Sequence, residues 1–138
     1  MSFSSGWSGA LLTGLMLGGC VATSESAKLA DEVDQIRSGH PTFMQRTFMT
    51  MDEQCRSTRR PTTTVVEAPK RGRVEAVTQN ATAIYESGPY AHCNDRVGKA
   101  LAFRYTSQPE YRGTDSFRVR VRYADGEIRH ARYNIEVY

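Results

Sequence analysis

The sequence predicts a small all-β domain, an antiparallel β-sandwich with one disulfide, and three observations support this fold class. After Cys55, short runs of β-branched and aromatic residues alternate with Pro, Gly and Asn, the spacing of strands and turns in β-sandwiches. Apolar and charged residues alternate from Phe117 to Tyr123, as in a strand with one buried face. The three cysteines are an odd number, which in an exported protein indicates one disulfide and one thiol with another role.

Turn residues divide the part of the chain after Cys55 into six predicted strands. The strands are Thr62–Glu67, Arg73–Thr78, Thr82–Glu86, Ala100–Thr106, Asp115–Tyr123 and Glu127–Tyr138. The last two form a hairpin, because Asp125-Gly126 supplies the positive φ angles of a tight turn. Ile128 is out of phase with the apolar residues that follow it, which predicts a bulge or a twist between Glu127 and Ala131.

Length and composition allow one domain with a modest core. The chain has 138 residues, 39% of them hydrophobic, and a formal net charge of +3. This charge gives a weak attraction to anionic surfaces without the signature of a nucleic-acid-binding protein. We expect no nucleic-acid partner.

The N-terminus has the pattern of an export signal. Residues Trp7–Val21 are apolar but shorter than the roughly 20 residues of a membrane-spanning helix. Leu17-Gly18-Gly19-Cys20 resembles the lipobox of bacterial lipoproteins, although the usual basic residue is missing from 1–6. The resemblance implies a signal peptide over residues 1–19, lipidation of Cys20 and, since Val21 follows, an outer-membrane anchor. The alternative is an ordinary secretory signal with a chance cysteine.

The region from residue 20 to 54 is predicted to be a lipid-anchored linker. Leu29, Val33 and Ile36 have helical spacing, which predicts a short helix over Glu25–Arg37 that ends before Gly39. Two Thr-Phe-Met repeats follow, with Phe43, Met44, Phe48 and Met49 as candidate docking residues. In the alternative, these side chains pack under the β domain or continue a helix through Met44, Phe48 and Met51.

Cys55 and Cys93 are the predicted disulfide, because both lie in the polar, turn-rich part of the chain. An exported protein folds in an oxidising compartment, so Cys55 and Cys93 are not expected to remain as two independent thiols. Closing the loop of 93 − 55 = 38 positions would contribute about 3–4 kcal/mol by loop-closure reasoning.

Three motifs stand out in the predicted domain, residues 55–138: Ala68-Pro69-Lys70-Arg71-Gly72-Arg73-Val74, Ala102-Phe103-Arg104-Tyr105-Thr106 and, most specific of the three, Gly113-Thr114-Asp115-Ser116-Phe117. Through these motifs the run from Pro61 to Tyr138 resembles the cadherin-like, immunoglobulin-like modules of bacterial envelope proteins. The resemblance implies an immunoglobulin-like sandwich with adhesive, spacer or assembly roles and other envelope proteins as partners. We therefore expect a protein-interaction or structural module of an envelope assembly, on the periplasmic or surface side of the membrane.

Catalytic and metal-binding patterns are not recognisable in the sequence. His40, His92 and His130 lie in no nucleophile or metal motif, and a set of Cys55, His92, Cys93 and Asp95 matches no familiar zinc spacing. The candidate calcium ligands, Asp95, Asp115 and Asp125, are scattered. We expect no enzymatic activity, no cofactor and no metal.

Two alternatives concern what the domain binds. Arg118, Arg120 and Arg122 project from one face, where Arg129 or Arg132 and Arg104 could join them to bind an anionic envelope glycan; otherwise they form a solvated face. Ser87-Gly88-Pro89-Tyr90 resembles, one residue shorter, the Ser-Gly-x-x-Tyr loop of periplasmic lysozyme inhibitors, which implies inhibition of a cell-wall hydrolase.

Overall fold

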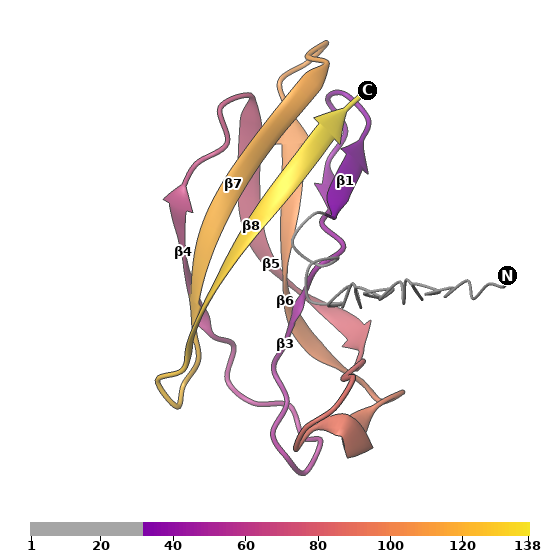
Figure 1. Ribbon diagram of the computed structural model, residues 1–138, viewed down its shortest axis with the longest axis vertical. Coiled ribbons are helices and arrows are strands. Elements are labelled where there is room, and N and C mark those ends of the chain that lie inside the picture. The colour runs from indigo at the N-terminus through magenta and orange to yellow at the C-terminus, as the bar shows by residue number, and fades with distance from the viewer. Residues whose placement is uncertain (1–31) are drawn as a thin grey trace, which may run out of the picture.

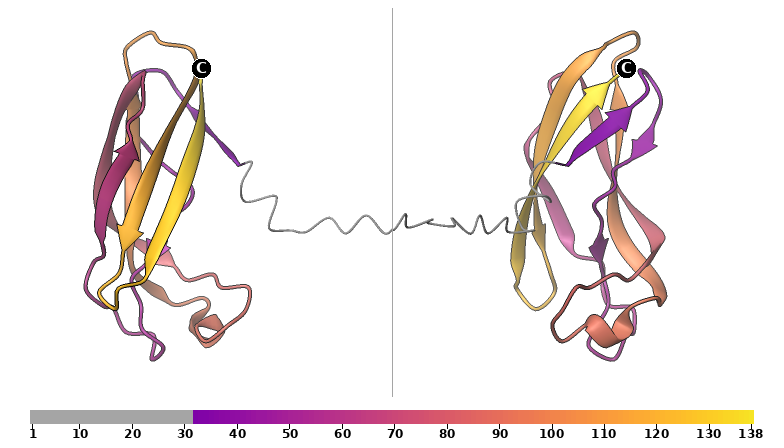
Figure 2. Two further views of the ribbon diagram at one scale, coloured as in Figure 1. Left: turned by 60° about the vertical axis from the view of Figure 1, so that its left-hand side comes forward. Right: turned by 45° about the vertical axis from the view of Figure 1, so that its right-hand side comes forward.

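The computed structural model describes residues 32–138, which form two β-sheets packed face to face (Figures 1 and 2). Sheet A has the order β1-β8-β7-β4, and in sheet B both β2 and β3 pair with one edge of β6 while β5 pairs with the other. The strands are β1 (Val33–Ile36), β2 (Thr42–Phe43), β3 (Phe48–Met49), β4 (Thr62–Glu67), β5 (Gly72–Thr82), β6 (Val97–Ser107), β7 (Gly113–Arg122) and β8 (Ile128–Val137). The predicted all-β sandwich is confirmed.

The strands predicted after Cys55 are formed, with one change in how the chain is divided. β4 has the predicted bounds, and β5 continues beyond the predicted run Arg73–Thr78 to Thr82. The predicted strand Thr82–Glu86 is wrong, because Ala83–Glu86 lies in the loop before β6. Ala83 is fully buried beneath that loop, so its apolar character reflects packing at the end of the sandwich rather than a further strand.

The hairpin of β7 and β8 is confirmed, but the bulge predicted in its return strand is wrong. Pairing is continuous from Gly113↔Val137 to Arg122↔Ile128. Ile128 therefore shares the outer face with Arg122 and is 49% exposed. Gly126 is the residue of this turn with positive φ, 93°, which is the geometry of a three-residue loop.

The helix predicted over Glu25–Arg37 is wrong where the structure describes it, because Val33–Ile36 is strand β1, parallel to β8. Residues 25–31 of that prediction lie outside the described residues. A narrow apolar stripe buries little surface on a helix, whereas a strand here satisfies the backbone groups at the edge of β8. It buries Asp34 and Ile36 while its alternate residues face solvent.

Strands β2 and β3 come from the predicted linker 20–54 and belong to sheet B, so the sandwich begins well before Cys55. Met44, Phe48 and Met51 are buried, as expected if the side chains of the Thr-Phe-Met repeats pack under the β domain. They do not continue a helix. Three hydrogen bonds hold the backbone between β2 and β3. Met44 N–H donates to Phe103 O at 2.9 Å, Gln45 N–H donates to Asp34 Oδ1 at 3.0 Å, and Tyr133 Oη donates to Arg46 O at 3.0 Å.

The core between the sheets is rich in aromatic rings. Phe117 stacks on Tyr133 with ring centroids 4.7 Å apart, and Phe103 contacts both rings from sheet B. Inward residues of β7 and β8 complete the core, as their alternation predicted. Among residues 32–138, no helix is long and apolar enough to cross a membrane.

Candidate functional site

Three loops gather at one end of the sandwich, the lower end in Figure 1. They are the β3–β4 loop (residues 50–61), the β5–β6 loop (83–96) with its 3-10 turn η2 (Ala91–Cys93), and the β7–β8 loop (123–127). We call this surface the loop end. Loops held by a rigid scaffold are where binding residues concentrate, so the loop end is the first candidate site.

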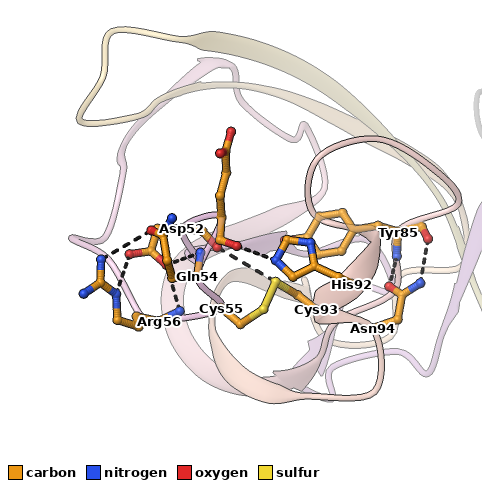
Figure 3. The surroundings of a disulfide bond; sticks show 9 residues. Asp52, Gln54, Cys55, Arg56, Tyr85, His92, Cys93 and Asn94 are labelled. Carbon is orange, nitrogen blue, oxygen red and sulfur yellow. Dashed lines mark hydrogen bonds and ion pairs between the residues drawn. A yellow bond between two sulfur atoms is a disulfide. The ribbon is translucent and has the colours of Figure 1, made fainter.

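The disulfide predicted between Cys55 and Cys93 is present at the loop end (Figure 3). It joins the β3–β4 loop to η2, with Cα atoms 5.4 Å apart. Cys93 is fully buried and packs with Met51 and Ala83 in a small apolar cluster separate from the main core. The disulfide and this apolar cluster together hold the two loops against each other.

Local hydrogen bonds fix both loops beside the disulfide (Figure 3). Asp52 Oδ1 accepts from the backbone N–H groups of Gln54 at 3.0 Å and Arg56 at 2.9 Å, and its Oδ2 accepts from Arg56 Nε at 3.0 Å. The Arg56 backbone hydrogen bond lowers the pKa of Asp52. On the other loop, Tyr85 N–H donates to Asn94 Oδ1 at 2.6 Å and Asn94 Nδ2 donates to Tyr85 O at 2.8 Å. The loop end is thus ordered before any partner binds.

A hollow of about 440 Å³ opens between these loops and the β7–β8 turn. Three tyrosines line it: Tyr85 and Tyr90 stack with ring centroids 5.4 Å apart, and Tyr123 comes from the end of β7. Burial raises the pKa of Tyr85 and of Tyr123. Within the described chain, the buried hydroxyl of Tyr123 has no hydrogen-bond partner. Ile84, 82% exposed, lies at the edge of the hollow.

Arg129 belongs to this hollow and not to the arginine face predicted from the sequence. Its guanidinium lies 5.0 Å from the ring centroid of Tyr123 and pairs with Glu127 at 2.8 Å. Arg129 pairs with Val121, a residue of the buried side of β7, so its side chain leaves the sheet on the inner side. The prediction that Arg129 could join the outer arginines is wrong because strand side chains alternate between faces.

The other predicted arginines divide between the two sheets. Arg118, Arg120 and Arg122 are exposed on the outer face of sheet A, where Arg132 lies directly opposite Arg118. Arg104 is not near them, because it lies on β6 in sheet B and pairs with Glu75.

The candidate docking residues of the Thr-Phe-Met repeats are also divided. Met44 and Phe48 are core residues, whereas Phe43 is 48% exposed and Met49 is half-buried at the hollow. Ser87, Gly88 and Pro89 are exposed on the β5–β6 loop, with Tyr90 half-buried beside them. Cys20 and the predicted signal peptide lie outside the described residues.

Potential metal ligands do meet at the loop end, but their sulfur atoms are bonded to each other. Ligand atoms of Cys55, His92 and Cys93 lie within 4.8 Å of one another. The disulfide leaves neither sulfur as a thiolate, the form that binds zinc. His92 Nε2 donates a hydrogen bond to the carbonyl of Glu53, so this histidine is a link between the two loops.

Sequence reasoning missed Tyr85 and Tyr123 as site residues. In the sequence, neither tyrosine differs from the other aromatic residues of a β-rich chain. Only the fold brings them together with Tyr90. A weak signal was available in the β5–β6 loop, where tyrosines and turn residues surround Cys93. Comparison with protein-family models, with curated proteins and with solved structures finds no match for this chain.

Proposed function

We propose that this chain is a non-enzymatic lipoprotein of a bacterial cell envelope whose sandwich is a protein-interaction or structural module of an envelope assembly. The observation that carries the proposal is the loop end, where a disulfide and local hydrogen bonds hold three loops around a tyrosine-lined hollow. Preorganisation of this kind favours binding, because little conformational entropy is lost when a partner docks.

The strand order supports an immunoglobulin-like module. β4, β7 and β8 lie in one sheet, and β2 with β3, β6 and β5 lie in the other. Counted along the chain with β2 and β3 as one strand, these are the CFG and BED sets of immunoglobulin domains. β1 departs from the constant-type arrangement by pairing with β8. In variable domains two of the corresponding loops at this end carry the binding residues.

The chemistry of the loop end suits a protein partner. Tyrosine offers a large contact area at a small cost in conformational entropy and is frequent among the residues that dominate binding energy. The exposed Ile84 beside the stacked Tyr85 and Tyr90 provides an apolar contact at the same surface.

Crosslinking in intact envelopes tests the interaction. The full chain is compared with a double variant, Ile84→Ser with Tyr90→Ser, and with Tyr138→Ser as the matched control, since Tyr138 is 58% exposed at the opposite end of the sandwich. We expect a discrete crosslinked species that the double variant loses and the control retains. Equal crosslinking by all three proteins would contradict the proposal.

Lipid attachment through Cys20 is tested by metabolic labelling with palmitate. Two or three acyl chains, each contributing about 0.8 kcal/mol per buried methylene, hold a protein firmly at a membrane. We expect label on the native chain and on Cys55→Ser, and none on Cys20→Ser. Label that persists on Cys20→Ser would exclude this anchor.

A second candidate, inhibition of a cell-wall hydrolase, is favoured by the exposure of Ser87, Gly88 and Pro89 at the loop end. A substrate-cleft inhibitor needs a projecting loop, and this one is braced by the Tyr85–Tyr90 stack. Lysozyme activity measured with micromolar protein decides the matter: unchanged activity removes this candidate and leaves the interaction module.

A further inference from the structure

The outer face of sheet A carries a group of arginines, and none of them lines the loop hollow. Arg118, Arg120 and Arg122 alternate along β7, and Arg132 lies directly opposite Arg118 on β8. Residues two apart on a strand are about 7 Å apart, and neighbouring strands about 4.8 Å, so each of these charges lies within one Debye length of its nearest neighbour. We call these four residues the arginine strip.

The arginine strip is poorly neutralised by the protein itself. Among the ion pairs of residues 32–138, one involves the strip, between Arg118 and Glu67 at 3.7 Å. Like charges directly opposite each other destabilise a sheet, so the Arg118↔Arg132 pair acts against the stability of the fold. Arg104 and Arg129, by contrast, have carboxylate partners at shorter distances. An anionic ligand would relieve the repulsion in the strip.

Neutral groups hold Arg132 in place without cancelling its charge. Its Nε donates to Asn134 Oδ1 at 3.2 Å, and its terminal nitrogen donates to Ser116 Oγ at 3.3 Å. A guanidinium has five N–H groups, so donors remain for an oxyanion. The side chain is therefore oriented and still charged, as an anion-binding group should be.

A hollow of about 480 Å³ adjoins the strip at the end opposite the loop end, and Arg132 and Ser116 line it. Lys70 and Arg71 add two further cations from the β4–β5 turn, while Glu67 and Glu136 contribute carboxylates. Asp115 fixes this turn by accepting hydrogen bonds from the backbone N–H groups of Lys70 at 3.0 Å and Arg71 at 2.9 Å. The strip thus continues into a preformed concave site.

The geometry points to a binding site for a linear acidic polysaccharide, which lies along the arginine strip and places a sugar in the adjoining hollow. Guanidinium forks match the planar oxyanions of such a chain, and the strip is only one or two side chains wide. A bilayer is a poorer fit, because its surface cannot fill a hollow. The hollow beside Arg132 shares no lining residue with the tyrosine hollow of the loop end.

Binding of fluorescein-labelled polygalacturonate to the full chain in mild detergent, followed by fluorescence anisotropy, tests the inference. The strip variant combines Arg118→Gln, Arg120→Gln and Arg122→Gln, and the control combines Arg59→Gln, Arg73→Gln and Arg96→Gln, three exposed arginines outside the strip. Both lose the same charge, and glutamine keeps part of the aliphatic stem. We expect the strip variant to lose at least about tenfold in affinity and the control no more than about twofold.

Salt and stability provide further readouts of the same proteins. Native binding should weaken steeply with added salt, and the strip variant should show a shallower dependence. The strip variant should melt no lower than the native chain, because the substitutions remove like-charge repulsion. If it nevertheless fails to fold, Arg132→Gln alone, with β7 unchanged, should still weaken binding.

Two results would overturn the inference. Equal losses in the strip and control variants would mean that overall charge, and not this site, attracts the polymer. Strip-dependent binding to phosphatidylglycerol vesicles, with polygalacturonate left unbound, would assign the face to a membrane instead.

Discussion

Asp115 shows how one side chain of a sequence motif holds distant parts of the fold together. Besides the backbone N–H groups of Lys70 and Arg71, its carboxylate accepts hydrogen bonds from Ser116 N–H at 2.9 Å and from Tyr105 Oη at 2.7 Å. These contacts join the start of β7 to the β4–β5 turn and to β6. The Gly-Thr-Asp-Ser-Phe motif thus has a structural role. Asp115 was also one of the scattered candidate calcium ligands, and its carboxylate already accepts hydrogen bonds from the protein.

Replacement of Asp115 by Ala should destabilise the protein by about 2–4 kcal/mol, because it leaves partly buried donors without an acceptor. Denaturant unfolding followed by far-UV circular dichroism measures the change in the free energy of unfolding. Asp125→Ala is the control: its carboxylate accepts from Glu127 N–H in an exposed turn, and its loss should cost about 1 kcal/mol or less. A cost for Asp115→Ala no larger than that of the control would refute this role.

Asp34 is a buried carboxylate at the edge where β1 meets the chain between β2 and β3. Burial raises its pKa, and the hydrogen bond from Gln45 N–H at 3.0 Å offsets this in part. The folded state therefore binds its proton more tightly than the unfolded state does. The free energy of unfolding must then fall as pH rises from the ordinary pKa of an aspartate, about 3.9, through the raised value.

Asp34→Asn should therefore melt at a higher temperature than the native chain at pH 7, since the amide can accept the same hydrogen bond without a buried charge. Below the ordinary pKa both side chains are neutral, and the difference should disappear. Thermal melts across this pH range measure it. A variant that melts lower than the native chain at pH 7 would count against the assigned cause.

At the scale of elements, the strands predicted best are those whose burial alternates over many residues. In β7 and β8 every apolar residue from Phe117 to Val121 and from Tyr133 to Val137 lies on the buried face. β1 was predicted as a helix because Val33 and Ile36 have helical spacing, and in the strand they lie on opposite faces, with Asp34 buried beside Ile36. Its parallel pairing with β8 depends on the free edge of a strand about a hundred positions later, which local periodicity cannot report.

Strands β2 and β3 give a direct test of the Thr-Phe-Met repeats. Met44→Ala should cost about 2–5 kcal/mol, because it leaves a cavity beside the aromatic core. Phe43→Ser, the exposed neighbour, should change stability by less than about 1 kcal/mol. Urea denaturation of both variants compares them, and similar costs would mean that the repeat does not divide into core and surface as described.

At the scale of the whole molecule, the sandwich has a large core between its sheets and a small one at the loop end. The disulfide lies in the small cluster, with Met51 and Ala83. The disulfide should thus stabilise mainly the loops that frame the tyrosine hollow, while the stability of β7 and β8 depends on the main core.

The double variant Cys55→Ser with Cys93→Ser should lose about 3–4 kcal/mol of stability, because the unfolded chain regains the entropy of the loop. Hydrogen exchange measured by mass spectrometry should accelerate first in residues 50–61 and 83–96. Exchange that rises equally in β7 and β8 under native conditions would show that the disulfide supports the whole fold and not this end.

Local sequence features were enough to predict the all-β class, most strand positions after Cys55, the Cys55–Cys93 pairing and the outward direction of Arg118, Arg120 and Arg122. These features follow from local periodicity, turn chemistry and cysteine position, which neighbouring residues specify. Three features became clear only in the folded protein: strands β1, β2 and β3 join the sheets, Arg129 turns inward, and three tyrosines meet in one hollow. Each of these depends on contacts between residues far apart in the chain, where the energy of packing and of edge pairing exceeds local preference.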